Sequence, residues 1–146
     1  GGMVKRGQNG AHRGIAHDII INNDGINHPI YKDKDKIFNT PAFNYDEVVT
    51  LPKGAILLSS NKVNNVMALN FETEISKIWG IQYHPEITYD KMITLIRFRR
   101  ERLLENKSFS DERDLESHIK MIEDENKITK KESRMRELKN WLDFIA

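Results

Sequence analysis

The hydrophobic period of the sequence changes at about Thr88, and this change constrains the fold more than any other feature. Before this residue, short β-branched runs alternate with turn residues, a pattern that is typical of strands. After it, apolar residues recur about every 3.6 positions, as on one face of an amphipathic helix. The chain is therefore predicted to be α/β, with strands first and helices last.

Five strands are predicted before Thr88, and the segments between them are rich in Asn, Gly and Pro, which favour turns. The first strand is followed by residues 22–25, Asn-Asn-Asp-Gly, which predict a turn. These spacings fit hairpins or short crossovers. The predicted strands cover residues 15–21, 47–51, 55–59, 66–71 and 78–83.

Three amphipathic helices are predicted after the strands. Thr88 and Ser110 mark the first two starts, and residues 129–132, Thr-Lys-Lys-Glu, have the spacing of a capping box for the third. Because short isolated helices are marginal in water, we expect the last two to pair or to fold back on the strands. Their apolar stripes are Met92, Ile96 and Leu103, then Leu115, Ile119 and Ile122, then Leu138, Trp141, Leu142 and Ile145.

Composition and charge exclude several classes of protein. The net charge of +1, from 23 basic and 22 acidic residues, gives no field that favours nucleic acid. The basic segment 97–102 also contains Glu101 and is interpreted as a solvated helix face with partial ion pairing. No run approaches the roughly 20 apolar residues of a membrane span, and no secretory stretch opens the chain, so we expect a cytoplasmic protein.

The chain contains no cysteine. This excludes disulfides, thiolate metal sites and a thiol nucleophile supplied by the chain itself. The spacing of His12 and His17 does not suit a metal pair on a strand, so we expect no metal site and no cofactor.

Residues 80–86, Gly-Ile-Gln-Tyr-His-Pro-Glu, are the stretch most specific for chemistry. An apolar strand runs into His84, and Pro85 ends its ladder. An imidazole and the Glu86 carboxylate then stand at the carboxyl end of a strand, where open α/β sheets bind ligands. In a nucleophilic triad His84 would be the base and Glu86 would orient it. In the alternative interpretation, His84 caps the strand and Glu86 begins the next helix, where its charge suits the positive end.

The same stretch resembles the Gly-x-Gln-Phe/Tyr-His-Pro-Glu motif of class I (triad-type) glutamine amidotransferases. Three further segments resemble this family in the same order along the chain. They are residues 28–31 (His-Pro-Ile-Tyr), 46–55 (Asp-Glu-Val-Val-Thr-Leu-Pro-Lys-Gly-Ala) and 58–61 (Leu-Ser-Ser-Asn). The resemblance extends through most of residues 1–104.

This resemblance implies a partial, flavodoxin-like amidotransferase domain with mixed β-strands and an incomplete parallel sheet over residues 1–106. A helical extension would follow over residues 107–146. The implied enzyme hydrolyses the amide of glutamine and passes ammonia to an acceptor that the sequence does not name. In such enzymes a Cys on a Gly-x-Cys-x-Gly elbow attacks the amide, His84 matches the base, and Glu86 matches the acid.

The segment of Phe43, Asn44, Tyr45 and Asp46 matches, through its backbone, the part of the family that helps to hold the glutamine substrate. The family usually has His at the position of Asn44. The resemblance therefore implies a pocket that is altered or specialised at this residue.

The second departure from the family is the missing elbow, since the chain has no Cys. Family members have a Gly-Gly pair downstream of the elbow helix, and this chain opens with Gly1 and Gly2. We therefore expect a truncated chain that is inactive alone, and a cloning remnant before Met3 is the alternative. Two other functions stay open: a non-catalytic binding module, and a related γ-glutamyl hydrolase or peptidase.

Two structural expectations complete the sequence-based account. An imidazole nitrogen of His84 should lie within about 3.2 Å of a Glu86 carboxylate oxygen. The exposed edge of an incomplete sheet must be covered, and the apolar stripe around Trp141 should dock on the rest of the chain or on a partner. The candidates for that partner are a second copy of the chain, through self-association, and a synthase subunit.

Overall fold

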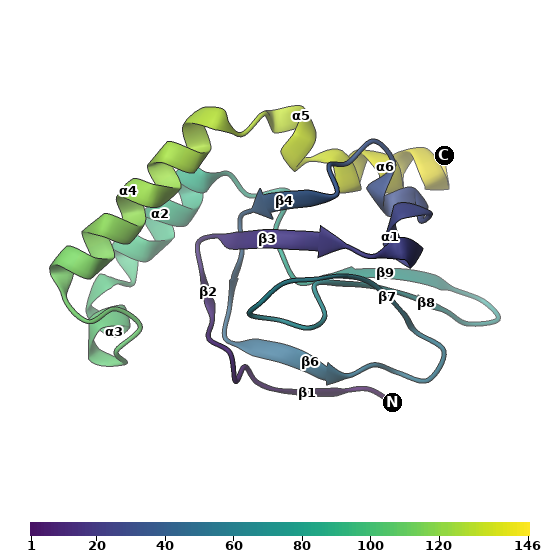
Figure 1. Ribbon diagram of the computed structural model, residues 1–146, viewed down its shortest axis with the longest axis horizontal. Coiled ribbons are helices and arrows are strands. Elements are labelled where there is room, and N and C mark those ends of the chain that lie inside the picture. The colour runs from purple at the N-terminus through teal and green to yellow at the C-terminus, as the bar shows by residue number, and fades with distance from the viewer.

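The largest sheet in the computed structural model, which describes residues 1–146, has five strands in the order β4-β3-β7-β8-β9 (Figure 1). Every neighbouring pair in it is antiparallel. The α/β class is confirmed, but the expected parallel sheet is wrong here. The connections between β7, β8 and β9 are shorter than the dozen or so residues that a parallel crossover needs. The strands are β3 (Ala16–Ile21), β4 (Ile37–Thr40), β7 (Ile56–Ser60), β8 (Ala68–Glu72) and β9 (Lys77–Ile81).

Two short antiparallel ribbons accompany this sheet. β1 (Met3–Arg6) pairs with β6 (Asp46–Thr50), and β2 (His12–Arg13) pairs with β5 (Phe43–Asn44). The sequence predicted β6 but not β1, whose four residues are all exposed and so show no buried alternation. It also missed β2 and β5, which have two residues each.

The helices lie at the edges of the strand region (Figure 1). α2 and α4 run side by side, and α6 packs against the short 3₁₀ helix η1. None of the helices combines the length and the apolar character that a membrane crossing requires. Their bounds are α1 (Asn23–Ile26), η1 (Pro29–Tyr31), α2 (Tyr89–Phe98), α3 (Arg100–Glu105), α4 (Glu112–Ile128), α5 (Lys131–Arg134) and α6 (Arg136–Ile145).

Side chains at the helix ends explain where the helices begin. Thr88 caps α2 as predicted, and its hydroxyl accepts a backbone N–H of the first turn at 3.3 Å. Asp111 caps α4 in the same way, at 2.8 Å. The predicted capping box is wrong, because α4 continues to Ile128 and the Thr129 hydroxyl donates to the Glu125 carbonyl at 2.9 Å. Thr129 therefore ends α4 and does not begin the next helix.

Residues 22–25, predicted as a turn, form the start of the one-turn helix α1. The Asn22 side chain accepts the Gly25 N–H at 2.8 Å. A Cβ atom on Gly25 would lie 2.2 Å from the carbonyl oxygen of Leu58 in β7. Only glycine lets α1 approach the strand this closely.

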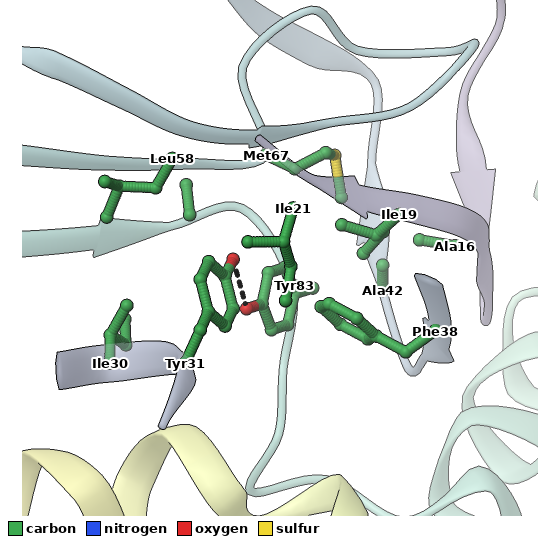
Figure 2. Close-up of a cluster of buried hydrophobic side chains, with 11 residues drawn as sticks. Ala16, Ile19, Ile21, Ile30, Tyr31, Phe38, Ala42, Leu58, Met67 and Tyr83 are labelled. Carbon is green, nitrogen blue, oxygen red and sulfur yellow. Dashed lines mark hydrogen bonds between the residues drawn. The ribbon is translucent and has the colours of Figure 1, made fainter. Parts of the chain in front are cut away.

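Two clusters of buried side chains form the core. The first lies against the large sheet, and Figure 2 shows the hydroxyls of Tyr31 and Tyr83 meeting within it, 2.9 Å apart. The second joins α2 and α4 to Ile15, next to β3. The expected return of the helices to the strand region is therefore confirmed for α4. The second cluster contains Ile15, Tyr89, Ile96, Leu103, Phe109, Leu115, Ile119 and Ile122.

The last helix docks through polar groups and through Phe144, whose ring centre lies 4.7 Å from that of Trp79, while most of the predicted apolar stripe stays exposed. The Asn140 amide is buried and donates to the carbonyls of Ile30 and Lys32, both at 2.8 Å. By contrast, Leu142 and Ile145 are 56% and 57% exposed. Docking on the rest of the chain is therefore wrong for these two residues, and docking on a partner stays a prediction.

Candidate functional site

His84 and Glu86 lie in the turn that connects β9 to α2. The His84 backbone N–H donates to the Pro41 carbonyl at 2.8 Å, which fixes the turn beside the segment that follows β4. His84 Nδ1 is 2.8 Å from Glu86 Oε1. The expected pairing is confirmed, whereas the catalytic roles of the two residues stay a prediction.

The pair leaves one nitrogen of the imidazole ring available. Because Glu86 accepts a hydrogen bond at Nδ1, the proton is assigned to that nitrogen, and Nε2 keeps its lone pair. Nε2 makes no hydrogen bond within the chain, and the His84 side chain is 41% exposed. An exposed pair of this kind contributes little to stability. Its geometry suits acceptance of a proton from a neighbouring group.

The predicted substrate segment lies directly beside the motif. The Gln82 side chain donates to the Asp46 carbonyl at 3.0 Å, and the Asn44 side chain donates to the same carbonyl at 2.8 Å. The segment is therefore held beside the motif through Gln82, whereas His84 and Glu86 are not among the residues that line the cavity at this segment. Phe43, Asn44, Tyr45 and Asp46 line a cavity of about 570 Å³ together with Arg6, Gln82, Arg99, Arg102, Leu103 and Asn106.

Asn44, where the amidotransferase family usually has His, belongs to a buried polar group. Its side-chain oxygen lies 2.7 Å from His12 Nδ1, and Asn61 Nδ2 lies 3.0 Å from His12 Nε2. Burial lowers the pKa of His12, and the hydrogen bonds to Asn44 and Asn61 oppose this shift. The Asn44 side chain therefore helps to hold β2 against β5. The buried position of His12 could not be predicted, because no local sequence pattern indicates it.

Basic residues of the segment 97–102 divide between two environments. Arg97 pairs with Glu116 at 2.8 Å and Arg100 with Glu112 at 2.6 Å. The predicted partial ion pairing is confirmed for these two. Arg99 instead lies over the Phe43 ring, 5.3 Å from its centre.

Sequence reasoning missed the C-terminal residues that contact the motif. The Tyr83 hydroxyl donates to the buried carboxylate of Glu137 at 2.9 Å. The Arg134 guanidinium donates to the carbonyls of Pro85 and Ile87. These contacts join residues about fifty positions apart, and no local pattern could have indicated them.

No group of three or more His, Asp or Glu side chains is arranged to hold a metal ion. The chain has no cysteine, so the site consists of an imidazole and a carboxylate without a thiol. This arrangement can accept a proton at His84 Nε2, and the Glu86 carboxylate can stabilise the imidazolium that forms.

Comparison with known proteins places this geometry in context. No family model matches the sequence. A γ-glutamyl-L-1-hydroxyisopropylamide hydrolase of a Pseudomonas species is 27% identical over an alignment that covers 90% of this chain and 50% of the relative.

Solved structures show the same fold. A glutamine amidotransferase of Thermotoga maritima superposes with a TM-score of 0.68 at 19% identity, covering 94% of this chain and 53% of that structure. A GMP synthase-type protein from Thermoplasma acidophilum gives a TM-score of 0.51 at 17% identity, covering 69% of this chain and 51% of that structure. The fold is therefore that of glutamine amidotransferase-like proteins, and the chain spans about half the length of the proteins it matches.

Proposed function

We propose that this chain carries the base and the orienting acid of a class I glutamine amidotransferase. The observation that supports the proposal is the 2.8 Å contact between His84 Nδ1 and Glu86 Oε1, with Nε2 left free. The same motif lies beside the segment that resembles the family's substrate-holding part. The fold of the solved amidotransferase and the likeness to the Pseudomonas hydrolase point in the same direction.

In the proposed reaction, His84 Nε2 takes the proton of a Cys thiol that lies outside these residues. The thiolate attacks the side-chain amide carbon of glutamine, and the C–N bond then breaks. The imidazolium returns its proton to the leaving nitrogen, so ammonia departs and a thioester remains. Water, deprotonated by His84, hydrolyses the thioester to glutamate and restores the thiol. Throughout, Glu86 holds the ring in one tautomer and stabilises its charged form.

The substrate would lie along Phe43, Asn44, Tyr45 and Asp46. The Asn44 side chain is occupied by His12 and by the Asp46 carbonyl, so it is not free for substrate. We therefore assign substrate contact to the backbone of this segment and to the cavity that it lines.

A second candidate is hydrolysis of another γ-glutamyl amide without transfer of ammonia. The name of the Pseudomonas relative, a γ-glutamyl amide hydrolase, favours it. For the amidotransferase candidate, the partner that receives ammonia would be a cytoplasmic synthase subunit, which the likeness to the Thermoplasma GMP synthase-type protein supports. A non-catalytic module that only binds a γ-glutamyl group is the third candidate.

The test begins with the coding sequence that precedes this chain in its gene. We expect an in-frame Gly-x-Cys-x-Gly elbow, and we call the product that contains both parts the elbow-bearing protein. It should release glutamate from L-glutamine or from a γ-glutamyl alkylamide, and the preferred substrate separates the first two candidates. An elbow-bearing protein that binds these compounds but hydrolyses neither would support the third.

The purified chain by itself should release no glutamate from L-glutamine. A base and its acid without a nucleophile retain only binding and electrostatic assistance, because the members of such a unit act together. Glutamate release that disappears in His84→Gln would contradict this expectation. Such release would require that His84 takes a proton from a water molecule that attacks the amide carbon directly.

A further inference from the structure

Arg134 is a buried cation next to the proposed site. It ends the short helix α5, and only 8% of the residue is exposed. Its Nη1 donates to the carbonyl of Pro85 and, at 3.0 Å, to the carbonyl of Ile87. These two carbonyls flank Glu86 in the chain. The guanidinium therefore holds the backbone on both sides of the residue that contacts His84.

No carboxylate within 4 Å forms an ion pair with Arg134. A buried charge is costly unless its hydrogen bonds are satisfied, so the two carbonyls provide the compensation. A neutral side chain could fill the same space at lower cost. The neutral side chain would, however, lack the two hydrogen bonds that tie the Pro85–Ile87 backbone to the end of α5.

Neighbouring contacts fix Arg134 in place. The Lys34 ammonium donates to the Ser133 carbonyl at 2.7 Å, one residue before Arg134. Glu137, one turn further on, accepts from the Tyr83 hydroxyl at 2.9 Å. The segment 133–137 therefore contacts the motif on both sides of His84, at Tyr83 and at the turn that contains Glu86.

Glu86 itself needs such support. Its side chain is 51% exposed and has His84 as its only hydrogen-bond partner. An exposed pair is easily lost to side-chain entropy and to water. A fixed backbone at Glu86 limits the positions that its carboxylate can take, and catalytic geometry is sensitive to displacements of about 1 Å.

We propose that Arg134 is a positioning residue that holds the Pro85–Ile87 backbone so that the Glu86 carboxylate stays on His84 Nδ1. The proposal rests on the proposed function, and it gives the C-terminal helices a role at the site. Through α5, the docking of the last two helices determines which nitrogen of His84 carries the proton.

The test measures that proton directly in the full chain, without substrate. Nitrogen NMR of ¹⁵N-histidine-labelled protein distinguishes a protonated Nδ1 from a protonated Nε2. Glu86→Gln provides the reference for loss of the carboxylate contact. Arg134→Met should move the His84 nitrogen shifts by about half of that reference change or more, because the hydrogen bond at Nδ1 sets the tautomer. Lys131→Met, an exposed cation on the same helix, is the matched control and should leave the shifts unchanged.

A purely structural role would change stability without changing the tautomer. The signals of His12 and His118 report whether each variant is folded. Should Arg134→Met fail to fold, Arg134→Lys keeps the charge but lacks the fixed fork of a guanidinium, and it should shift His84 in the same direction by a smaller amount. Wild-type His84 shifts in either folded Arg134 variant would overturn the proposal. The proposed function fails separately, if His84 proves dispensable in the elbow-bearing protein.

Discussion

Replacing Lys34 with Ala should destabilise the chain strongly, because it breaks the buried ion pair that Lys34 forms with Glu137. The Lys34 and Glu137 side chains are each 1% exposed and lie 3.1 Å apart. Burial lowers the pKa of Lys34, and the charge of Glu137 acts in the opposite direction. Removing the ammonium leaves the Glu137 carboxylate with the Tyr83 hydroxyl as its remaining donor. The variant therefore contains a buried carboxylate without its ion-pair partner.

Breaking a buried ion pair in this way costs about 3–5 kcal/mol. A chain of this size loses about 2–4 °C of melting temperature per kcal/mol, so a fall of roughly 10 °C is expected. The total free energy of unfolding of such a chain is about 5–15 kcal/mol, so the loss is a large fraction of it. Urea unfolding followed by circular dichroism measures this free energy.

The matched control removes both charges at once. Lys34→Met combined with Glu137→Gln removes both charges of the pair and should lie within about 1.5 kcal/mol of the unmodified chain, because such pairs add little net stability. A loss below about 1 kcal/mol in Lys34→Ala would refute the reasoning. A double variant with the same free energy of unfolding as Lys34→Ala would also refute the reasoning.

Two further predictions concern the core and its response to acid. Ile119 in α4 is 1% exposed, so Ile119→Ala should cost about 2–5 kcal/mol in urea unfolding, whereas Ile128→Ala, at 74% exposure, should stay within about 0.5 kcal/mol. Equal effects would mean that α4 is not part of the core. Because burial lowers the pKa of His12 below its ordinary 6.5, the folded chain binds fewer protons there than the unfolded chain. Stability should be complete above pH 6.5 and decline as the pH falls below it, and His12→Asn should reduce that decline; an unchanged pH profile would contradict the assignment.

The sequence was most informative where chemistry and local order coincide. His84 and Glu86 are two positions apart after an apolar strand, so their proximity follows from the backbone, and the 2.8 Å contact agrees. The position of β9 before them followed from its short apolar run. Whether the strands pair in parallel or antiparallel could not be predicted in this way, because side chains alternate with a period of two in both arrangements.

The support around the site could not be predicted from the sequence. Arg134 and Glu137 lie on helices whose apolar stripe suggested docking through Trp141 and Leu142. In the structure, polar contacts of Glu137 and Asn140 hold α6, and Trp141 stays 45% exposed. A buried charge has no periodic signature in the sequence, since its partners come from distant segments. The buried position of His12 could not be predicted either, because its partners Asn44 and Asn61 come from distant segments.

The central claim is that His84 acts as the base for cleavage of a γ-glutamyl amide, and its direct test is the rate of glutamate release by the elbow-bearing protein. His84→Gln should reduce kcat/KM by about 10³-fold or more, and Glu86→Gln by on the order of 10²–10⁴-fold. The matched control, His17→Gln, replaces an exposed imidazole elsewhere on the chain and should leave the rate unchanged. If His84→Gln keeps the rate of the His17→Gln control, the account of this site is contradicted.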